Sequence, residues 1–188
     1  MLIDLKKLER GSDAEKGITK KNGINRYINE SVNNQLSEQL GNIVMGETIY
    51  YSTGAKWSLH DLLVKCLAQT GPADVHLCFY AIKEYQARLL SKMKNEGHIQ
   101  SLNALLFYRA GVNDPGAVQV LSECSDTFGL MRTHAKLLVI RNDNWGVSII
   151  GSANLTTNTQ ADVGIITCDT TIADYWIEWI KKNIHNGN

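Results

Sequence analysis

A chain of 188 residues with 44% hydrophobic content is long enough to bury one core and too short for two full-sized domains. Nineteen Lys and Arg balance nineteen Asp and Glu, so the protein has no global positive field to hold nucleic acid, and only a local basic patch could do so. No apolar stretch approaches the roughly 20 residues of a membrane-spanning helix, and charges interrupt the N-terminal apolar residues before a signal peptide could form. We therefore expect a soluble, cytoplasmic protein with no stable membrane association.

The first 46 residues are predicted to form a polar leader, separate from a folded domain at 47–188. Within this leader Ile24, Ile28, Val32 and Leu36 recur at every fourth position. This spacing predicts one amphipathic helix.

From residue 47 onward, segments typical of strands and helices alternate. Short apolar runs and two-residue alternation predict strands at 48–52, 75–79, 102–108, 136–140, 147–150 and 163–167. Apolar residues at helical spacing predict helices at 57–67, 82–93, 117–121 and 172–180, the first of them capped by Ser58. The alternation predicts an α/β fold with a mixed, largely parallel central sheet flanked by helices on both faces.

The cysteines are Cys66, Cys78, Cys124 and Cys168, and none is paired at C-x-x-C spacing. The five histidines are not close to them at the spacing of zinc ligands. We therefore expect buried free thiols, with no metal and no other cofactor.

Two neighbouring predicted strands carry polar residues that suit a phosphate. His134 and Lys136 should share one face of a strand, because side chains alternate along it. The strand at 147–150 leads into Gly151-Ser152-Ala153-Asn154, whose hydroxyl and amide groups can donate hydrogen bonds. A phosphate needs such cationic and neutral donors around its oxygens.

Each of these features also has an ordinary structural interpretation. His134 and Lys136 could lie on the solvent face of a half-exposed strand. Asn154 could cap a helix starting near Leu155, and Asp162, a short distance downstream, could be a surface acid. The order of all these residues along the chain favours a functional site.

The sequence His134-x-Lys136, an apolar strand and Gly151-Ser152-x-Asn154 resembles the HKD signature of the phospholipase D superfamily. The resemblance implies a metal-independent reaction in which His134 attacks phosphorus and a second histidine protonates the leaving oxygen. It also implies that Lys136 and Asn154 hold the phosphate oxygens, with support from Ser152. Asp162 would orient the imidazole. Residues 47–188 would then be a catalytic domain of phospholipase D type.

The chain departs from the family pattern in two respects. Arg141 stands where the family usually has an aspartate, and three extra residues separate the two strands, so 142–145 should form a longer hairpin turn. The family's active site also needs two signatures, whereas this chain has one. We therefore expect a homodimer in which two copies of His134 share one site.

The favoured function is a phosphodiesterase acting as a nuclease on DNA or RNA. Small members of the family with one signature per chain resemble nucleases, and no membrane-docking segment is evident. One alternative is a hydrolase or transferase acting on phospholipid or another small phosphodiester. The other is a catalytically degenerate module that binds nucleic acid or protein, since Arg141 replaces the motif aspartate.

Overall fold

The computed structural model describes residues 24–28, 36–156 and 160–186. Within these residues eight strands form one sheet in the order β1-β2-β8-β7-β6-β3-β4-β5. The strands are β1 (Ile24–Ile28), β2 (Glu47–Ser52), β3 (Ala73–Phe79), β4 (Ile99–Phe107), β5 (Thr127–Met131), β6 (Lys136–Arg141), β7 (Gly146–Gly151) and β8 (Val163–Cys168).

The sheet is mixed, as predicted, but it is not largely parallel. The pairs β1/β2, β3/β4 and β4/β5 are parallel, whereas β2/β8, β8/β7, β7/β6 and β6/β3 are antiparallel. The reason is the type of connection. Helices join β3 to β4 and β4 to β5 and return the chain for parallel pairing, whereas a tight turn joins β6 to β7 and forces antiparallel pairing.

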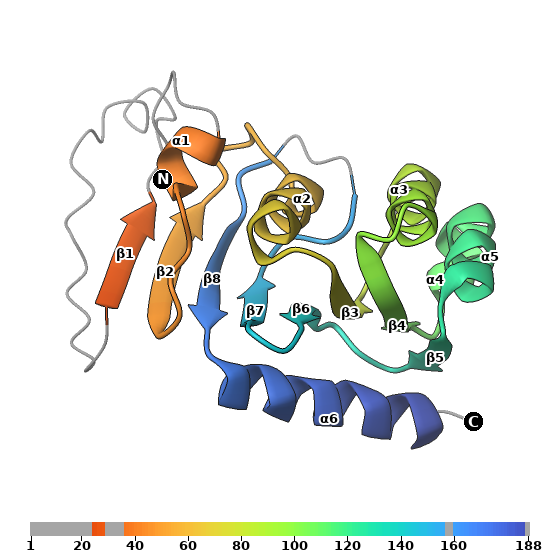
Figure 1. The fold of residues 1–188 in the computed structure, drawn as a ribbon. Helices are drawn as coiled ribbons and strands as arrows, with labels where there is room; N and C mark the ends of the chain where they lie inside the picture. The colour runs from red at the N-terminus through yellow and green to blue at the C-terminus, as the bar shows by residue number, and fades with distance from the viewer. Residues whose placement is uncertain (1–23, 29–35, 157–159, 187–188) are drawn as a thin grey trace, which may run out of the picture.

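Helices cover both faces of the sheet, as the sequence predicted (Figure 1). Helices α2, α3 and α5 lie on one face, and α6 crosses the other face (Figure 1). The helices are α1 (Leu36–Leu40), α2 (Leu59–Thr70), α3 (Glu84–Asn95), α4 (Ala110–Asn113), α5 (Pro115–Cys124) and α6 (Thr170–Asn186). Among them none is both long and apolar enough to cross a lipid bilayer.

The helix boundaries follow from local chemistry. Ser58 caps α2 as predicted: its Oγ accepts a hydrogen bond from Asp61 N at 3.2 Å, and the Asp61 carboxylate accepts one from Ser58 N at 2.7 Å. Gly71 ends this helix with a φ of 75°, which a side chain would disfavour. The Asp114 carboxylate caps α5 by accepting from Ala117 N at 3.1 Å.

Strand β6 separates two buried layers. Leu138 and Ile140 belong to the larger core between the sheet and α2, α3 and α5. Leu137 and Val139 point to the other face of the sheet, where they pack against Ile177 and other buried residues of α6. Because both faces are covered, the strand is apolar throughout, and this accounts for its uninterrupted hydrophobic run.

The segment before Glu47 does not form the single helix predicted from its spacing. Ile24–Ile28 is strand β1, paired in parallel with β2, and Leu36–Leu40 is the short helix α1, which packs against α2. A spacing of four also fits the two-residue period of a strand, so the pattern was ambiguous. Val32 lies outside the described residues, and the division at residue 47 stays a prediction.

A buried histidine makes the fold sensitive to acid. His76 on β3 is 2% exposed, and burial, reinforced by Lys181, lowers its pKa from 6.5 to about 4. At a pH between these two pKa values, His76 is protonated in the unfolded chain and neutral in the folded protein. The free energy of unfolding should therefore be highest above pH 6.5 and fall as the pH drops toward 4, by up to about 3 kcal/mol.

Urea denaturation across this pH range measures the effect. His76→Asn should flatten the pH dependence, leaving the part due to His60, whose pKa is also lowered by burial. Replacing the exposed His98 by alanine should leave the slope unchanged. An equal slope in the wild type and the His76 variant would contradict the assignment.

Candidate active site

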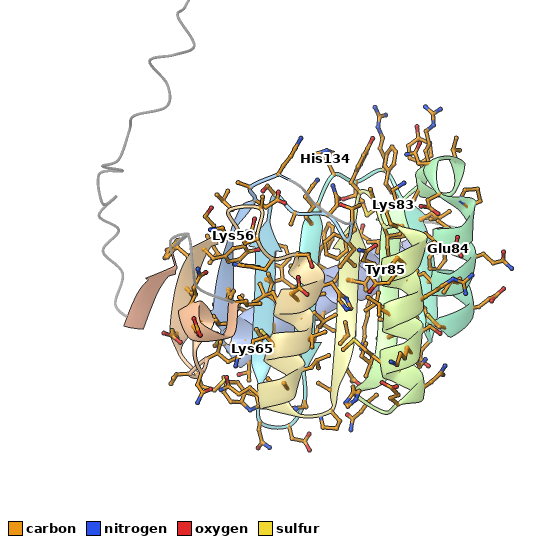
Figure 2. The ribbon with its side chains drawn as sticks, turned by 90° about the horizontal axis from the view of Figure 1, so that it is seen from above. Lys56, Lys65, Lys83, Glu84, Tyr85 and His134 are labelled. Atoms are coloured by element: carbon orange, nitrogen blue, oxygen red, sulfur yellow. The ribbon has the colours of Figure 1, made fainter. Side chains whose placement is uncertain are left out.

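The residues singled out from the sequence meet at one edge of the sheet. Strands β2, β3, β4 and β7 end there, and β6 and β8 begin there, as the pairs Phe79 with Lys136 and Gly151 with Gly164 show. We call this the active edge. Figure 2 shows His134 toward this end of the strands and Lys65 toward the opposite end.

His134 and Lys136 lie side by side at the start of β6. The Lys136 ammonium donates to the His134 carbonyl oxygen at 3.0 Å and lies 3.3 Å from Nδ1 of the ring. His134 precedes the strand by two residues and is exposed. Its backbone is held by Thr133, whose Oγ1 accepts a hydrogen bond from Ala135 N at 3.0 Å.

A tyrosine that the sequence did not single out completes this part of the site. The rings of Tyr80 and His134 lie 4.7 Å apart, and the Lys136 ammonium lies 5.6 Å from the centre of the Tyr80 ring. Tyr80 directly follows β3, which neighbours β6. Only the pairing of these two strands, distant in sequence, could have identified it.

Asn154 is positioned by the loop after β3. Its Oδ1 accepts a hydrogen bond from Ala81 N at 3.1 Å, which turns the carboxamide so that its NH₂ group is the end left for a ligand. The adjoining Leu155 accepts from Lys83 N at 3.0 Å and ties the two loops together. Residues 155–156 are not helical, so Asn154 is not a helix cap.

Ser152 and Asp162 form a hydrogen-bonded pair between the end of β7 and the start of β8. Ser152 Oγ donates to the Asp162 carboxylate at 2.6 Å and accepts from Val163 N at 3.1 Å. Thr53, at the end of β2, accepts from Asp162 N at 2.9 Å through its hydroxyl. Ser152 is therefore one partner of the Asp162 carboxylate, and a contact with an imidazole stays a prediction.

The Asp162 carboxylate influences the pKa of two neighbouring side chains, Lys136 and Tyr51. Partial burial lowers the pKa of the Lys136 ammonium, while the nearby Asp162 carboxylate opposes that shift. Burial and the same carboxylate raise the pKa of Tyr51. An anion bound at the active edge would thus meet a lysine that is partly removed from water, where its charge acts more strongly.

Gly151 is required by close packing between β7 and β8. A Cβ atom at this position would lie 2.5 Å from the carbonyl oxygen of Val163, closer than side chains approach. The glycine therefore lets the two strands bring Ser152 and Asp162 together.

Arg141, the residue in place of the family's aspartate, is remote from the active edge. It ends β6, five residues beyond Lys136, a span of about 17 Å at the rise of a strand. Its guanidinium binds Asp174 of α6 at 2.9 Å and the carbonyl oxygens of Asn142 and Trp145 in the turn before β7. That turn covers 142–145, as predicted. Arg141 therefore supports the hairpin and α6.

Replacing Arg141 by alanine should lower the free energy of unfolding by about 1 kcal/mol, because the ion pair with Asp174 is half-exposed. Turnover at a temperature where the variant remains folded should be unchanged. Thermal denaturation and an activity assay on the same preparation test both statements. A large loss of turnover in a folded Arg141→Ala variant would show that this position matters for catalysis.

The described residues contain no cluster of three or more His, Cys, Asp or Glu side chains suited to a metal ion. All four cysteines are free thiols, and three of them, Cys66, Cys78 and Cys168, are buried. Cys78 lies next to the His134 loop, 3.9 Å from Thr133 Oγ1, and burial raises its pKa to about 11.

Comparisons with known proteins identify the fold. No protein-family model and no curated protein sequence matches the chain. The solved structures that resemble it include Nuc from Salmonella typhimurium, a phospholipase D family member (TM-score 0.54, 12% identity, 75% of this chain and 95% of that chain). NucT from Helicobacter pylori is similar (TM-score 0.54, 14% identity, 73% and 95%). Polyphosphate kinase from Porphyromonas gingivalis matches over 79% of this chain and 29% of its own (TM-score 0.57, 14% identity).

At these identities the likeness concerns the fold alone. It covers about three quarters of this chain for Nuc and NucT. The protein thus has the fold of the phospholipase D superfamily.

Proposed function

We propose that this protein is a phosphodiesterase that forms a phosphohistidine at His134 and acts on nucleic acid. The observation that carries the proposal is the meeting of His134, Lys136, Asn154 and Ser152 at one edge of a phospholipase D-like sheet. An exposed imidazole can serve as a nucleophile, and the ammonium, amide and hydroxyl groups can bind phosphate oxygens.

The reaction has two steps. The His134 imidazole forms a bond to phosphorus while the bond to the leaving oxygen breaks, and a second histidine gives its proton to that oxygen. Water then attacks phosphorus, loses its proton to the second histidine and releases His134. Lys136 and Asn154 stabilise the charge on the phosphate oxygens in both transition states.

We infer that the second histidine comes from another copy of the chain. In the described structure the side-chain neighbours of the His134 ring are Tyr80 and Lys136, and no other histidine contacts it. The remaining histidines lie in α2, in β3, after α3 and in α6 (His60, His76, His98 and His185). We therefore propose a homodimer that shares one active site.

The sheet offers a surface for this dimer on the face that α6 only partly covers. Ile150 on β7 pairs with Ile165 on β8, and both point to the side of α6, as does Val163. Their exposed fractions are 40%, 38% and 60%. Such a cluster of exposed aliphatic side chains beside the active edge suits contact with a second copy.

The proposed function is tested with the wild-type protein in excess chelator. We expect cleavage of single-stranded DNA or RNA and of a generic diester, with little turnover of a short-chain phosphatidyl substrate. Rapid quenching with a ³²P-labelled substrate should trap an acid-labile phosphoryl group on the peptide containing His134. Binding of nucleic acid with neither cleavage nor labelling would support the degenerate module instead.

A further inference from the structure

We propose that a strip of aromatic rings beside His134 binds unpaired nucleotides, so that the enzyme acts on single strands. The strip consists of Tyr80, Phe107 and Tyr108, flanked by Arg109 and Arg132, and we call it the aromatic strip. The proposal rests on the proposed function and specifies its substrate.

The rings form a continuous series that starts at the proposed nucleophile. The ring centres of His134 and Tyr80 are 4.7 Å apart, those of Tyr80 and Phe107 are 4.5 Å apart and those of Phe107 and Tyr108 are 4.7 Å apart. Tyr80 follows β3 and Phe107 ends the neighbouring strand β4, so the series runs along the active edge. It leads away from the sheet face proposed as the dimer interface.

The outer end of the strip faces solvent. Tyr108 is 51% exposed, although its backbone N is fixed by a hydrogen bond to Met131 O at 2.9 Å. Tyr80 and Phe107 are half-buried. Tyr80 and Phe107 stack on each other, whereas the Tyr108 ring stands at 65° to Phe107, so exposed Tyr108 can offer a ring face on which a base stacks.

Two exposed arginines adjoin the strand ends that carry these rings. Arg109 follows Tyr108 directly, and Arg132 follows Met131 at the end of the adjacent strand β5. Both arginines are exposed, and neither forms an ion pair within the described residues. Lys136 lies at the same edge, so three cationic residues follow this edge of a protein of zero net charge. Such cationic residues can bind the phosphates on either side of a stacked base.

An unpaired strand fits this arrangement better than a duplex does. In a duplex the faces of the bases are covered by their neighbours, so aromatic side chains cannot stack on them. An unpaired strand exposes both base faces and phosphates, and stacking of this kind tolerates any sequence. Single-stranded DNA and RNA share this chemistry, so both should bind.

The experiment compares Tyr108→Ala with Tyr85→Ala, a matched variant of another exposed tyrosine, which lies on α3. With a fluorescent single-stranded oligonucleotide, Tyr108→Ala should lower kcat/KM by about 10- to 100-fold, mostly through KM. Its effect on bis(p-nitrophenyl) phosphate, which carries no base, should be at least about fivefold smaller. Tyr85→Ala should leave both activities unchanged.

Binding measured by fluorescence anisotropy separates this proposal from the proposed chemistry. The His134→Ala protein, which cannot form the phosphohistidine, should bind single-stranded DNA and RNA more tightly than duplex DNA of the same sequence. Adding Arg132→Ala should reduce the slope of log affinity against log salt by about one. Preference for duplex, or equal binding with and without Tyr108, would overturn the aromatic strip even if catalysis at His134 holds.

Discussion

Replacing His134 by alanine should reduce kcat for phosphodiester cleavage by a factor of about 10⁴ or more, because the variant lacks the atom that bonds to phosphorus. A loss of this size corresponds to at least about 5 kcal/mol of the activation barrier. The variant should remain folded, since the side chain is exposed and its contacts are with Tyr80 and Lys136 at the surface.

The measurement is steady-state turnover of a generic diester in chelator, with circular dichroism to confirm the fold. His98→Ala is the matched control, because His98 is also exposed and lies beyond the end of α3, with its Nε2 3.8 Å from the Glu96 carboxylate. That control should retain full activity. Equal rates for the wild type and the His134 variant would refute His134 as the nucleophile.

The grouping of the candidate residues could be predicted from the sequence because its main pair is local. Two-residue alternation placed His134 and Lys136 on one side, and the structure brings their side chains to 3.3 Å of each other. The hairpin between β6 and β7 then carries Ser152 and Asn154 to the same edge. These relations depend only on neighbouring strands, which local patterns describe well.

The remaining parts depend on contacts between segments far apart in the chain. Tyr80 and Ala81 reach the site because β3 pairs with β6, and no local pattern specifies that neighbour. The same limitation explains why the sheet was expected to be largely parallel. Strand β5 and helix α4 were missed because each is short and neither shows a clear apolar period.

The position of Arg141 weakens the case for a degenerate protein. In the sequence, losing the aspartate could mean losing the reaction. In the structure this position lies at the far end of β6 and contributes to the hairpin and to α6. The groups proposed to bind phosphate lie at the other end of the strand, so the substitution leaves their arrangement intact.

The proposed dimer makes catalysis depend on association. Changing Ile165 to aspartate would place two carboxylates in the apolar contact, one from each copy, and like charges facing each other cost several kcal/mol. We expect dissociation into monomers and a loss of activity of about 100-fold at concentrations where the wild type is dimeric. Because Ile165 is already 38% exposed in the single chain, the variant should still fold. Val64→Asp, on α2 with 44% exposure, is the matched control and should remain dimeric and active.

Mixing wild-type protein with the His134→Ala variant tests the shared site directly. If each site needs one imidazole from each copy, a mixed dimer is inactive. With a ninefold excess of the variant, after subunits have exchanged, activity per wild-type chain should fall to about one tenth, because most wild-type chains then have an inactive partner. Independent sites would leave it unchanged. A protein that sediments as a monomer and still turns over substrate would show that the group protonating the leaving oxygen lies in the same chain as His134.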